Sequence, residues 1–389
     1  MYNRIRMLKS ISIKNFKGIK NLDNLRFGQG ATFIIGQNGV GKSTLISAIY
    51  LTSQIIKHRS ANEVLDEFVP LGEEFISHNS NSSTAEFSFC LSVREDIYRF
   101  SYSISTDSDL FKISTERLEE LNPDYTIKEL VYERMQDGIK VPNGNIPLHV
   151  NDDEFVLSSY GEDRTRTLAS TIKNYKVLWF NGNNGESKFR VYSSENLNQQ
   201  SLDAIAVKLY KEDPSSFESA TKVIKTLIPS FTAPEIREIS PDSNSSSESR
   251  YIVFWKEGWS DGSVLSYAVP GLSGGNLRII ELIFTLYSSK DAICLIGEEL
   301  ENGQYLGRIK TLLEIVNTLA IKRNIQMIFT THSNDVLSNV SPRNVIYAEK
   351  NEDGYSIFQS LDEKVDSAYI KGILGEEPTT KDLIDMGVI

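Results

Sequence analysis

The chain has 389 residues, of which 40% are hydrophobic and 24% are charged, and its formal net charge is −11. This length suits two or three lobes with a real core, and the composition is that of an ordinary globular protein. The acidic balance excludes a generally basic protein that coats nucleic acid. No apolar run is long enough to span a bilayer, and no apolar segment follows residues 1–6, so we expect a cytoplasmic protein without a signal peptide.

The cysteines and histidines do not form a metal-binding pattern. Cys90 and Cys294 each lie in an apolar segment, which predicts buried thiols in a reducing compartment. The four histidines are scattered, so we expect neither a zinc site nor an HNH-type nuclease centre. A group of lysines near the start is more simply a solvated strand face than a nucleic-acid stripe. Its members are Lys9, Lys14, Lys17 and Lys20.

The first third of the chain reads mainly as strands. Residues 8–16 alternate between apolar and polar side chains, which predicts an edge strand. A second strand at 31–35 leads into a glycine-rich segment, and residues 44–56 have the pattern of a helix. Residues 85–106 repeat with a period of two, which predicts a hairpin, and strand-like pieces continue to residue 135. We interpret this region as an antiparallel sheet inserted after the first helix.

The middle of the chain carries fewer signals. We predict a short strand at 176–180, a loop at 181–185 and a glycine-free helical stretch at 202–227. Residues 240–249 are rich in serine and asparagine, which predicts a flexible loop or hairpin tip between strands that pair. No internal repeat and no heptad run long enough for a coiled coil is present.

The most informative stretch is GQNGVGKST at residues 36–44, which has the G-x-x-x-x-G-K-[ST] spacing of a phosphate loop between a strand and a helix. Glycines let the backbone curl so that its N–H groups point at phosphate oxygens, and the helix N-terminus adds positive potential. We expect Lys42 to reach the β- and γ-phosphates and Ser43 to bind Mg²⁺. The other members of this cradle are Gly36, Asn38, Gly39, Gly41 and Thr44. A glycine loop kept for turn geometry alone is the simpler alternative.

A second anion-binding pattern follows much later. Leu-Ser-Gly-Gly at 272–275 opens a predicted helix at 277–286, so Ser273, Gly274 and Gly275 present N–H donors at a helix start. This match of four residues is weak by itself.

Two buried strands follow this helix. The apolar run 292–297 ends in Glu298 and Glu299, at the strand edge where ligands bind in open α/β sheets. One acid can support Mg²⁺ and its neighbour can polarise water, although a solvated acidic turn is the alternative. The strand at 324–329 ends in Thr-Thr-His-Ser, where His332 is a candidate γ-phosphate contact or a structural histidine.

The order of these four elements makes an independent coincidence implausible. Together with NFKGI at 15–19 and EELENG at 298–303, they make the chain resemble the ABC-type ATPase family, in particular the bacterial AAA/OLD-like and RecF/SMC-like heads rather than transporter subunits. The resemblance implies an α/β fold, namely a P-loop ABC-type ATPase head with a mixed core sheet, an inserted antiparallel β-subdomain and a helical signature lobe.

We expect three segments. Residues 1–180 would be an N-terminal nucleotide-binding lobe with the P-loop and the β insertion, and residues 181–270 a helical or variable lobe. Residues 271–389 would carry the signature, the Walker B strand and the His switch, with a short helical tail.

The resemblance also implies a site that two protomers share. ATP and Mg²⁺ would be bound between head-to-tail subunits, with residues 36–44 of one protomer facing 272–275 of the other. Glu299 would be the catalytic base, His332 the γ-phosphate sensor and Glu298 a metal-side acid. Lys17 would join the nucleotide contacts.

The chain departs from the family pattern at several positions. Glu298 stands where many relatives have Asp, Asn276 where transporters have Gln, and Tyr305 where relatives often have His. The glutamine of the Q-loop stays open among Gln54, Gln136, Gln199 and Gln200.

The function that these features favour is a dimeric, or higher even-numbered, ATP-driven switch. Residues 334–389 are too few for the Toprim nuclease of many OLD-like relatives, so we expect a separately encoded nuclease or other effector. The chain thus resembles ATPase components of bacterial antiphage systems such as Septu and PARIS. A RecF/SMC-like DNA-repair ATPase is one alternative, which the acidic balance disfavours, and a non-catalytic ATP-binding scaffold is another. No membrane partner is expected.

Overall fold

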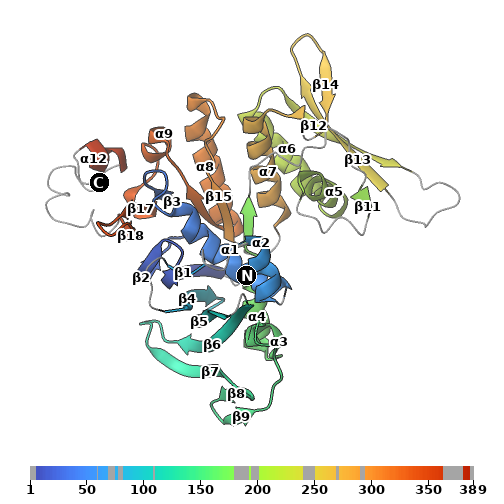
Figure 1. Cartoon of the computed structure of the whole chain (residues 1–389). Coiled ribbons are helices and arrows are strands. Elements are labelled where there is room, and N and C mark those ends of the chain that lie inside the picture. Colours follow the sequence, from blue (N-terminus) through green and yellow to red (C-terminus); the bar gives the residue numbers. More distant parts are fainter. Residues whose placement is uncertain are drawn as a thin grey trace. The chain divides into compact units, whose positions relative to one another are not determined.

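The computed structural model describes residues 6–58, 60–68, 75–77, 82–107, 110–178, 192–193, 201–239, 250–268, 271–289, 294–361 and 380–385. The chain forms two compact units, which Figure 1 shows coloured along the sequence. The first comprises Met1–Val177, Ala292–Glu299 and Ala320–Ile389, and the second comprises Leu178–Asp291 and Leu300–Leu319. The segment expected as one lobe, 271–389, thus contributes to both units, and the division into three segments stays a prediction.

The first unit contains two sheets and several helices. Its strands are β1 (Arg6–Phe16), β2 (Ile19–Arg26), β3 (Ala31–Ile35), β4 (Thr84–Val93), β5 (Asp96–Asp107), β6 (Leu110–Leu121), β7 (Ile127–Met135), β8 (Gly138–Val141), β9 (Gly144–Ile146), β10 (Lys176–Leu178), β15 (Cys294–Glu298), β16 (Gln326–Thr330), β17 (Val345–Lys350) and β18 (Ser356–Ser360). Its helices are α1 (Lys42–His58), α2 (Ala61–Phe68), α3 (Val156–Ser159), α4 (Asp163–Lys173), α9 (Asn334–Leu337), the 3₁₀ turn Pro342–Asn344 and α12 (Thr380–Asp385).

The core sheet has the order β10-β15-β16-β3-β17-β18. Strands β15, β16, β3 and β17 run parallel, and β18 is antiparallel to β17, so the expected mixed sheet is confirmed. Every residue of β3 and β16 is buried, which explains why both strands read as continuous apolar runs. Because parallel strands end at one edge, the segments after β3, β15 and β16 meet there.

The second sheet is antiparallel, with the order β2-β1-β4-β5-β6-β7-β8-β9. The predicted hairpin is confirmed as β4 and β5, in which Phe87 lies opposite Tyr102 and Phe89 opposite Phe100. These four side chains are buried, and the rings of Phe87 and Tyr102 stack with centroids 5.0 Å apart. The Tyr102 hydroxyl also lies 2.7 Å from Thr52 Oγ1, which ties the sheet to α1.

One expectation about this sheet is wrong. β1 is not an edge strand, because it pairs with β2 on one side and β4 on the other. The antiparallel strands expected after α1 are confirmed, and they extend the sheet that β1 and β2 begin, as Figure 1 shows. The alternation of one strand shows which of its faces is buried, but not how many neighbours it has.

The second unit contains α5 (Leu202–Glu212), α6 (Pro214–Leu227), α7 (Gly274–Ser288) and the strands β11 (Tyr192–Ser193), β12 (Phe231–Ile239), β13 (Arg250–Gly258) and β14 (Val264–Tyr267). α8 (Leu306–Arg323) starts in this unit. Trp255 on β13 is fully buried, donates a hydrogen bond to Asp203 on α5 at 2.7 Å and meets Phe284 on α7 edge to face. The sheet therefore packs against the helices of its own unit.

The pairing expected around residues 240–249 is confirmed, because Ile236 lies opposite Val253 and Ile239 opposite Arg250. The helical stretch predicted at 202–227 is confirmed, and it divides into α5 and α6. Asp213 ends α5, and its side chain then accepts the Ser216 N–H at 3.1 Å, with Pro214 in the first turn of α6. A capping Asp followed by Pro is a helix start signal that the glycine-free pattern concealed.

Several expectations lie partly or wholly outside the described residues. The strand at 176–180 is described as β10 only, the loops at 181–185 and 240–249 are not described, and α12 is the described part of the helical tail.

Both cysteines are free and buried. None of the helices that the structure describes has the length and apolarity needed to cross a bilayer.

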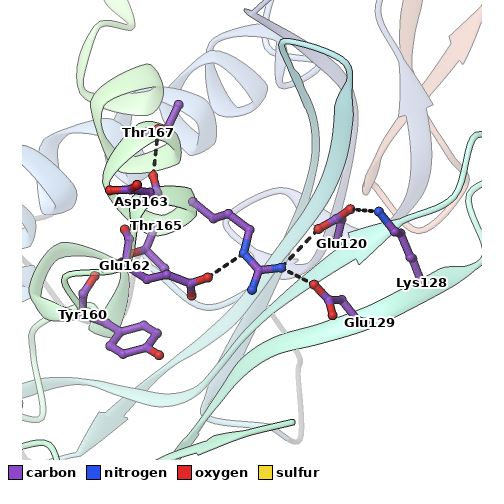
Figure 2. Close-up of polar contacts among 9 residues, drawn as sticks. Glu120, Lys128, Glu129, Tyr160, Glu162, Asp163, Thr165 and Thr167 are labelled. Carbon is purple, nitrogen blue, oxygen red and sulfur yellow. Dashed lines mark hydrogen bonds and ion pairs between the residues drawn. The ribbon is translucent and has the colours of Figure 1, made fainter.

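Figure 2 shows how charges join α4 to the antiparallel sheet of the first unit. Glu120 on β6, Glu129 on β7 and Glu162 before α4 converge on one guanidinium, which belongs to Arg164. The Glu162 contact is 2.6 Å and the Glu120 contact is 3.2 Å. Lys128 also pairs with Glu120, whose side chain is only 8% exposed. A nearly buried carboxylate thus depends on two cations.

Replacing Arg164 with alanine should lower the free energy of unfolding by about 1–3 kcal/mol, because Glu120 then keeps only one of these two cations. Urea unfolding followed by circular dichroism measures the change. Arg166→Ala is the matched control, since this arginine of the same helix is 70% exposed and its pair with Asp163 should contribute less than about 1 kcal/mol. Equal effects of both substitutions would contradict a special role for the Arg164 network.

Candidate functional site

The loop between β3 and α1 has the backbone of a phosphate cradle. Gly36 and Gly41 have φ values of +148° and +100°, in a region that L side chains rarely adopt. A Cβ on Gly36 would lie 2.1 Å from the Ala348 carbonyl oxygen, and one on Gly41 would lie 2.2 Å from Ser356 Oγ. The loop therefore packs directly on β17 and β18, and both positions require glycine. α1 begins at Lys42, two residues earlier than predicted.

Lys42 is held inside this loop. Its Nζ donates to the Gly36 and Gln37 carbonyl oxygens at 2.9 and 2.8 Å, and only 7% of the residue is exposed. Burial lowers the pKa of Lys42, while the charges of Glu299 and Glu298 act in the opposite direction. The ammonium is therefore held within the cradle, in the field of both carboxylates.

Glu298 fits a metal-side role. It is the last residue of β15, and its Oε1 is buried without a hydrogen-bond partner among the described residues. A buried carboxylate oxygen without a donor is costly unless a cation or another group satisfies it. Ser43 presents an exposed hydroxyl in the first turn of α1. Carboxylate and hydroxyl oxygens suit Mg²⁺, so the two residues present fit this ion.

Glu299 occupies a strained backbone position. Its φ is +48°, a left-handed conformation that costs about 1–2 kcal/mol for a residue with a Cβ. The Glu299 N–H donates to the Thr330 carbonyl oxygen at 2.9 Å, which holds the residue beside the end of β16. Such strain is concentrated at functional sites, where the surroundings fix an otherwise unfavourable geometry.

Glu299 and His332 lie close together at the edge of the core sheet. Glu299 Oε1 lies 3.8 Å from His332 Nε2, and the two side chains are 41% and 33% exposed. They come from the ends of neighbouring parallel strands, so strand pairing sets their approach. Both groups remain open to solvent, as a base that activates water requires.

Lys17 lies in the turn between β1 and β2, with a left-handed φ of +48°. The neighbouring Gly18 accepts a hydrogen bond from the Ser356 N–H at 2.8 Å, and a Cβ on Gly18 would lie 3.1 Å from Ser356 Oγ. Because Ser356 also packs under Gly41, the Lys17 turn lies next to the phosphate loop. The structure therefore brings the predicted contacts of the first unit to one edge of the core sheet.

The signature segment belongs to the second unit. Ser273 caps α7, with its Oγ accepting the Asn276 N–H at 3.3 Å, so the predicted helix is confirmed and begins at Gly274. Ser273 and Gly274 are exposed, whereas Gly275 is buried. A Cβ on Gly275 would lie only 2.2 Å from the Gly303 carbonyl oxygen, so this glycine allows the turn at 302–304 to approach.

No sequence motif marks the residues that hold this second turn. Gln304 Nε2 donates to the Gly275 carbonyl oxygen at 2.6 Å, and Arg308 Nη1 donates to Asn276 Oδ1 at 3.2 Å. Their only sequence signal is their place after Asn302-Gly303. Gln304 is the next residue, and Arg308 is the fifth residue after Gly303. Of the glutamines left open, Gln54 is buried within α1, Gln136 is exposed between β7 and β8, and residues 199–200 are not described.

One cavity of about 760 Å³ lies among β6, β7, β8 and residues 147–152, and none of the predicted site residues lines it. The part of the chain that the structure describes contains no cluster of three or more His, Cys, Asp and Glu side chains able to hold a metal.

Comparisons with known proteins give a family for this chain and show which solved structures share its fold. The family model described as "AAA domain, putative AbiEii toxin, Type IV TA system" matches residues 31–338. The fold is similar to the crystal structure of the SmcHead bound to the C-winged helix domain of ScpA, with a TM-score of 0.56, 15% identity, and coverage of 92% of this chain and 99% of that chain.

The Smc head domain with an extended coiled coil, bound to the C-terminal domain of ScpA derived from Pyrococcus furiosus, is also similar. Its TM-score is 0.51 at 13% identity, and the alignment covers 93% of this chain and 98% of that chain. No curated protein matches the sequence. These structural likenesses show an α/β fold of the SMC ATPase-head type, which confirms the fold class.

Proposed function

Because the chain belongs to the AAA domain family that matches residues 31–338, and therefore carries a P-loop ATPase domain, we propose that it binds ATP with Mg²⁺ and hydrolyses the nucleotide in a head-to-tail dimer. The observation that carries this proposal is the meeting of Lys42, Glu298, Glu299 and His332 at the carboxyl edge of one parallel sheet. An ammonium in a glycine cradle opposite two acids suits phosphoryl transfer to water.

Each residue of the site has a separate role in the proposed reaction. Lys42 and the loop N–H groups bind the β- and γ-phosphates, and Ser43 with Glu298 would hold Mg²⁺, which neutralises phosphate charge. Glu299 takes a proton from the water that attacks the γ-phosphorus, while the bond from that phosphorus to the bridging oxygen breaks. ADP and phosphate leave. His332 contacts the γ-phosphate and holds the Glu299 carboxylate in place.

The second half of the site comes from a partner protomer. Ser273 and Gly274 are exposed at the N-terminus of the 15-residue helix α7, which supports an approach to the partner's triphosphate. ATP would then close the dimer and hydrolysis would open it. The dimer is a nucleotide-driven switch in this scheme.

The output of the switch is a separately encoded effector, such as a nuclease, in a bacterial antiphage system. The resemblance to ATPase components of such systems supports this role, and the family description refers to a toxin–antitoxin system. The net charge of −11 disfavours the alternative of a DNA-repair ATPase that grips DNA.

Phosphate release from Mg²⁺–ATP by the purified chain tests the proposal. The wild type should turn over, and Lys42→Ala should fall to background with weakened nucleotide binding, because the buried ammonium is lost from the cradle. Lys57→Ala is the control, since this exposed lysine at the other end of α1 should not matter. Equal rates in the wild type and Lys42→Ala would overturn the assignment.

A further inference from the structure

In the second unit, two turns that are far apart in sequence are locked together. Gly275, in the first turn of α7, packs on the Gly303 carbonyl so closely that a Cβ would lie 2.2 Å from that oxygen. Gln304 Nε2 donates to the Gly275 carbonyl oxygen at 2.6 Å. Gly303 has a left-handed φ of +76°, which directs the chain back onto α7. The start of α7 and the turn at 302–304 therefore form one local surface.

Four side chains next to this contact form a ring of hydrogen bonds, namely those of Glu257, Asn276, Gln304 and Arg308. Asn276 Nδ2 donates to Glu257 Oε1 at 3.0 Å, and Asn276 Oδ1 accepts from Arg308 Nη1 at 3.2 Å. The same Arg308 Nη1 lies 3.4 Å from Gln304 Oε1, and Gln304 returns to Gly275. Both ends of the Asn276 amide are thus engaged within its own protomer. Its backbone N–H is also engaged, by Ser273 Oγ.

We propose that Gln304 and Arg308 are positioning residues that hold Ser273, Gly274 and the turn at 302–304 in one fixed arrangement before a partner's nucleotide arrives. This inference rests on the proposed head-to-tail function. It makes Asn276 a clamp rather than a nucleotide contact, because both ends of its amide are already engaged. Nucleotide contacts from this turn then fall to the exposed Ser273 and Gly274.

Preorganisation is what the ring contributes. Loops that become ordered on association lower affinity, because the ordering entropy opposes binding. A half-site whose N–H donors already point outward avoids this cost, and it places the donors correctly for charge that develops in the transition state. All four side chains of the ring are partly buried, so the ring is placed to hold the surface rather than to fill a core.

The test uses the full chain with Arg308→Ala and Gln304→Ala, each in a Glu299→Gln background that binds ATP without turnover. Each substitution should weaken ATP-dependent dimerisation about tenfold, which corresponds to about 1.4 kcal/mol, the upper end of the net contribution of one hydrogen bond. Binding of a fluorescent ATP analogue to the protomer should change less than twofold. In the absence of ATP, amide hydrogen exchange at residues 273–277 should be faster in each alanine variant than in the Glu299→Gln parent.

Lys310→Ala is the matched control, because this exposed cation lies on the same helix. Arg308→Lys should recover part of the dimerisation, since lysine keeps the charge but loses the planar fork. Unchanged dimerisation and unchanged exchange in both alanine variants would overturn the inference. If the Glu299→Gln background itself does not dimerise with ATP, that result contradicts the proposed head-to-tail dimer, and the inference about Gln304 and Arg308 is overturned as well.

Discussion

Replacing Glu299 with glutamine should slow phosphate release by about 10²–10⁴-fold, the usual contribution of a positioned general base, and leave ATP binding intact. The substitution keeps the side chain's shape beside His332, 3.8 Å from Oε1 in the wild type, but removes the proton acceptor. ATP-bound dimers should therefore accumulate. Phosphate release gives the rate, and size-exclusion chromatography with light scattering detects the trapped dimer.

Glu299→Gly separates the chemistry of this residue from its backbone strain. It should be as inactive as Glu299→Gln, yet more stable by about 1 kcal/mol, because glycine accepts a φ of +48° without a Cβ penalty. Glu314→Gln, at an exposed position on α8, is the control for loss of one charge. Retained turnover in Glu299→Gln would remove Glu299 as the base and leave His332 or a bound water as the acceptor.

The parts that the sequence predicted are those in which one segment carries its own signal. The phosphate loop is such a segment, because its glycines and Lys42 are needed by local geometry wherever the loop occurs. The acids at the end of β15 and His332 after β16 were also predictable, since parallel buried strands end at one edge of a sheet. The mixed core sheet was expected only from the resemblance to ABC-type ATPase heads.

The parts that the sequence could not predict depend on partners from elsewhere in the chain. β1 alternates like an edge strand, and only its pairing with both β2 and β4 shows that it lies inside the sheet. Gln304 and Arg308 carry no motif, because their role depends on the distance between two turns in the folded unit. The left-handed backbone conformation of Glu299 likewise could not be predicted from the residue type, since glutamate rarely adopts that conformation.

The two neighbouring glycines of the signature should respond in opposite ways to alanine. Gly275→Ala places a Cβ 2.2 Å from the Gly303 carbonyl oxygen, and both partners are backbone, so the turn at 302–304 must move away. The free energy of unfolding of the second unit should fall by about 1–3 kcal/mol, the range for overpacked positions. Urea unfolding followed by tryptophan fluorescence measures this, because Trp255 is buried in the same unit.

Gly274→Ala is the matched partner of this experiment, since no atom of the described residues lies within 4 Å of its Cβ position. Its stability should be unchanged or rise by up to about 1 kcal/mol, because alanine favours the helix. ATP-dependent dimerisation should nevertheless weaken if a triphosphate from a partner approaches this turn, since a methyl group would then block the N–H donors. Normal dimerisation of Gly274→Ala would show that the glycine serves no close approach and would contradict a nucleotide shared between protomers. A stable but dimerisation-deficient Gly274→Ala, beside an unstable Gly275→Ala, would assign one glycine to the partner's nucleotide and the other to the fold of its own unit.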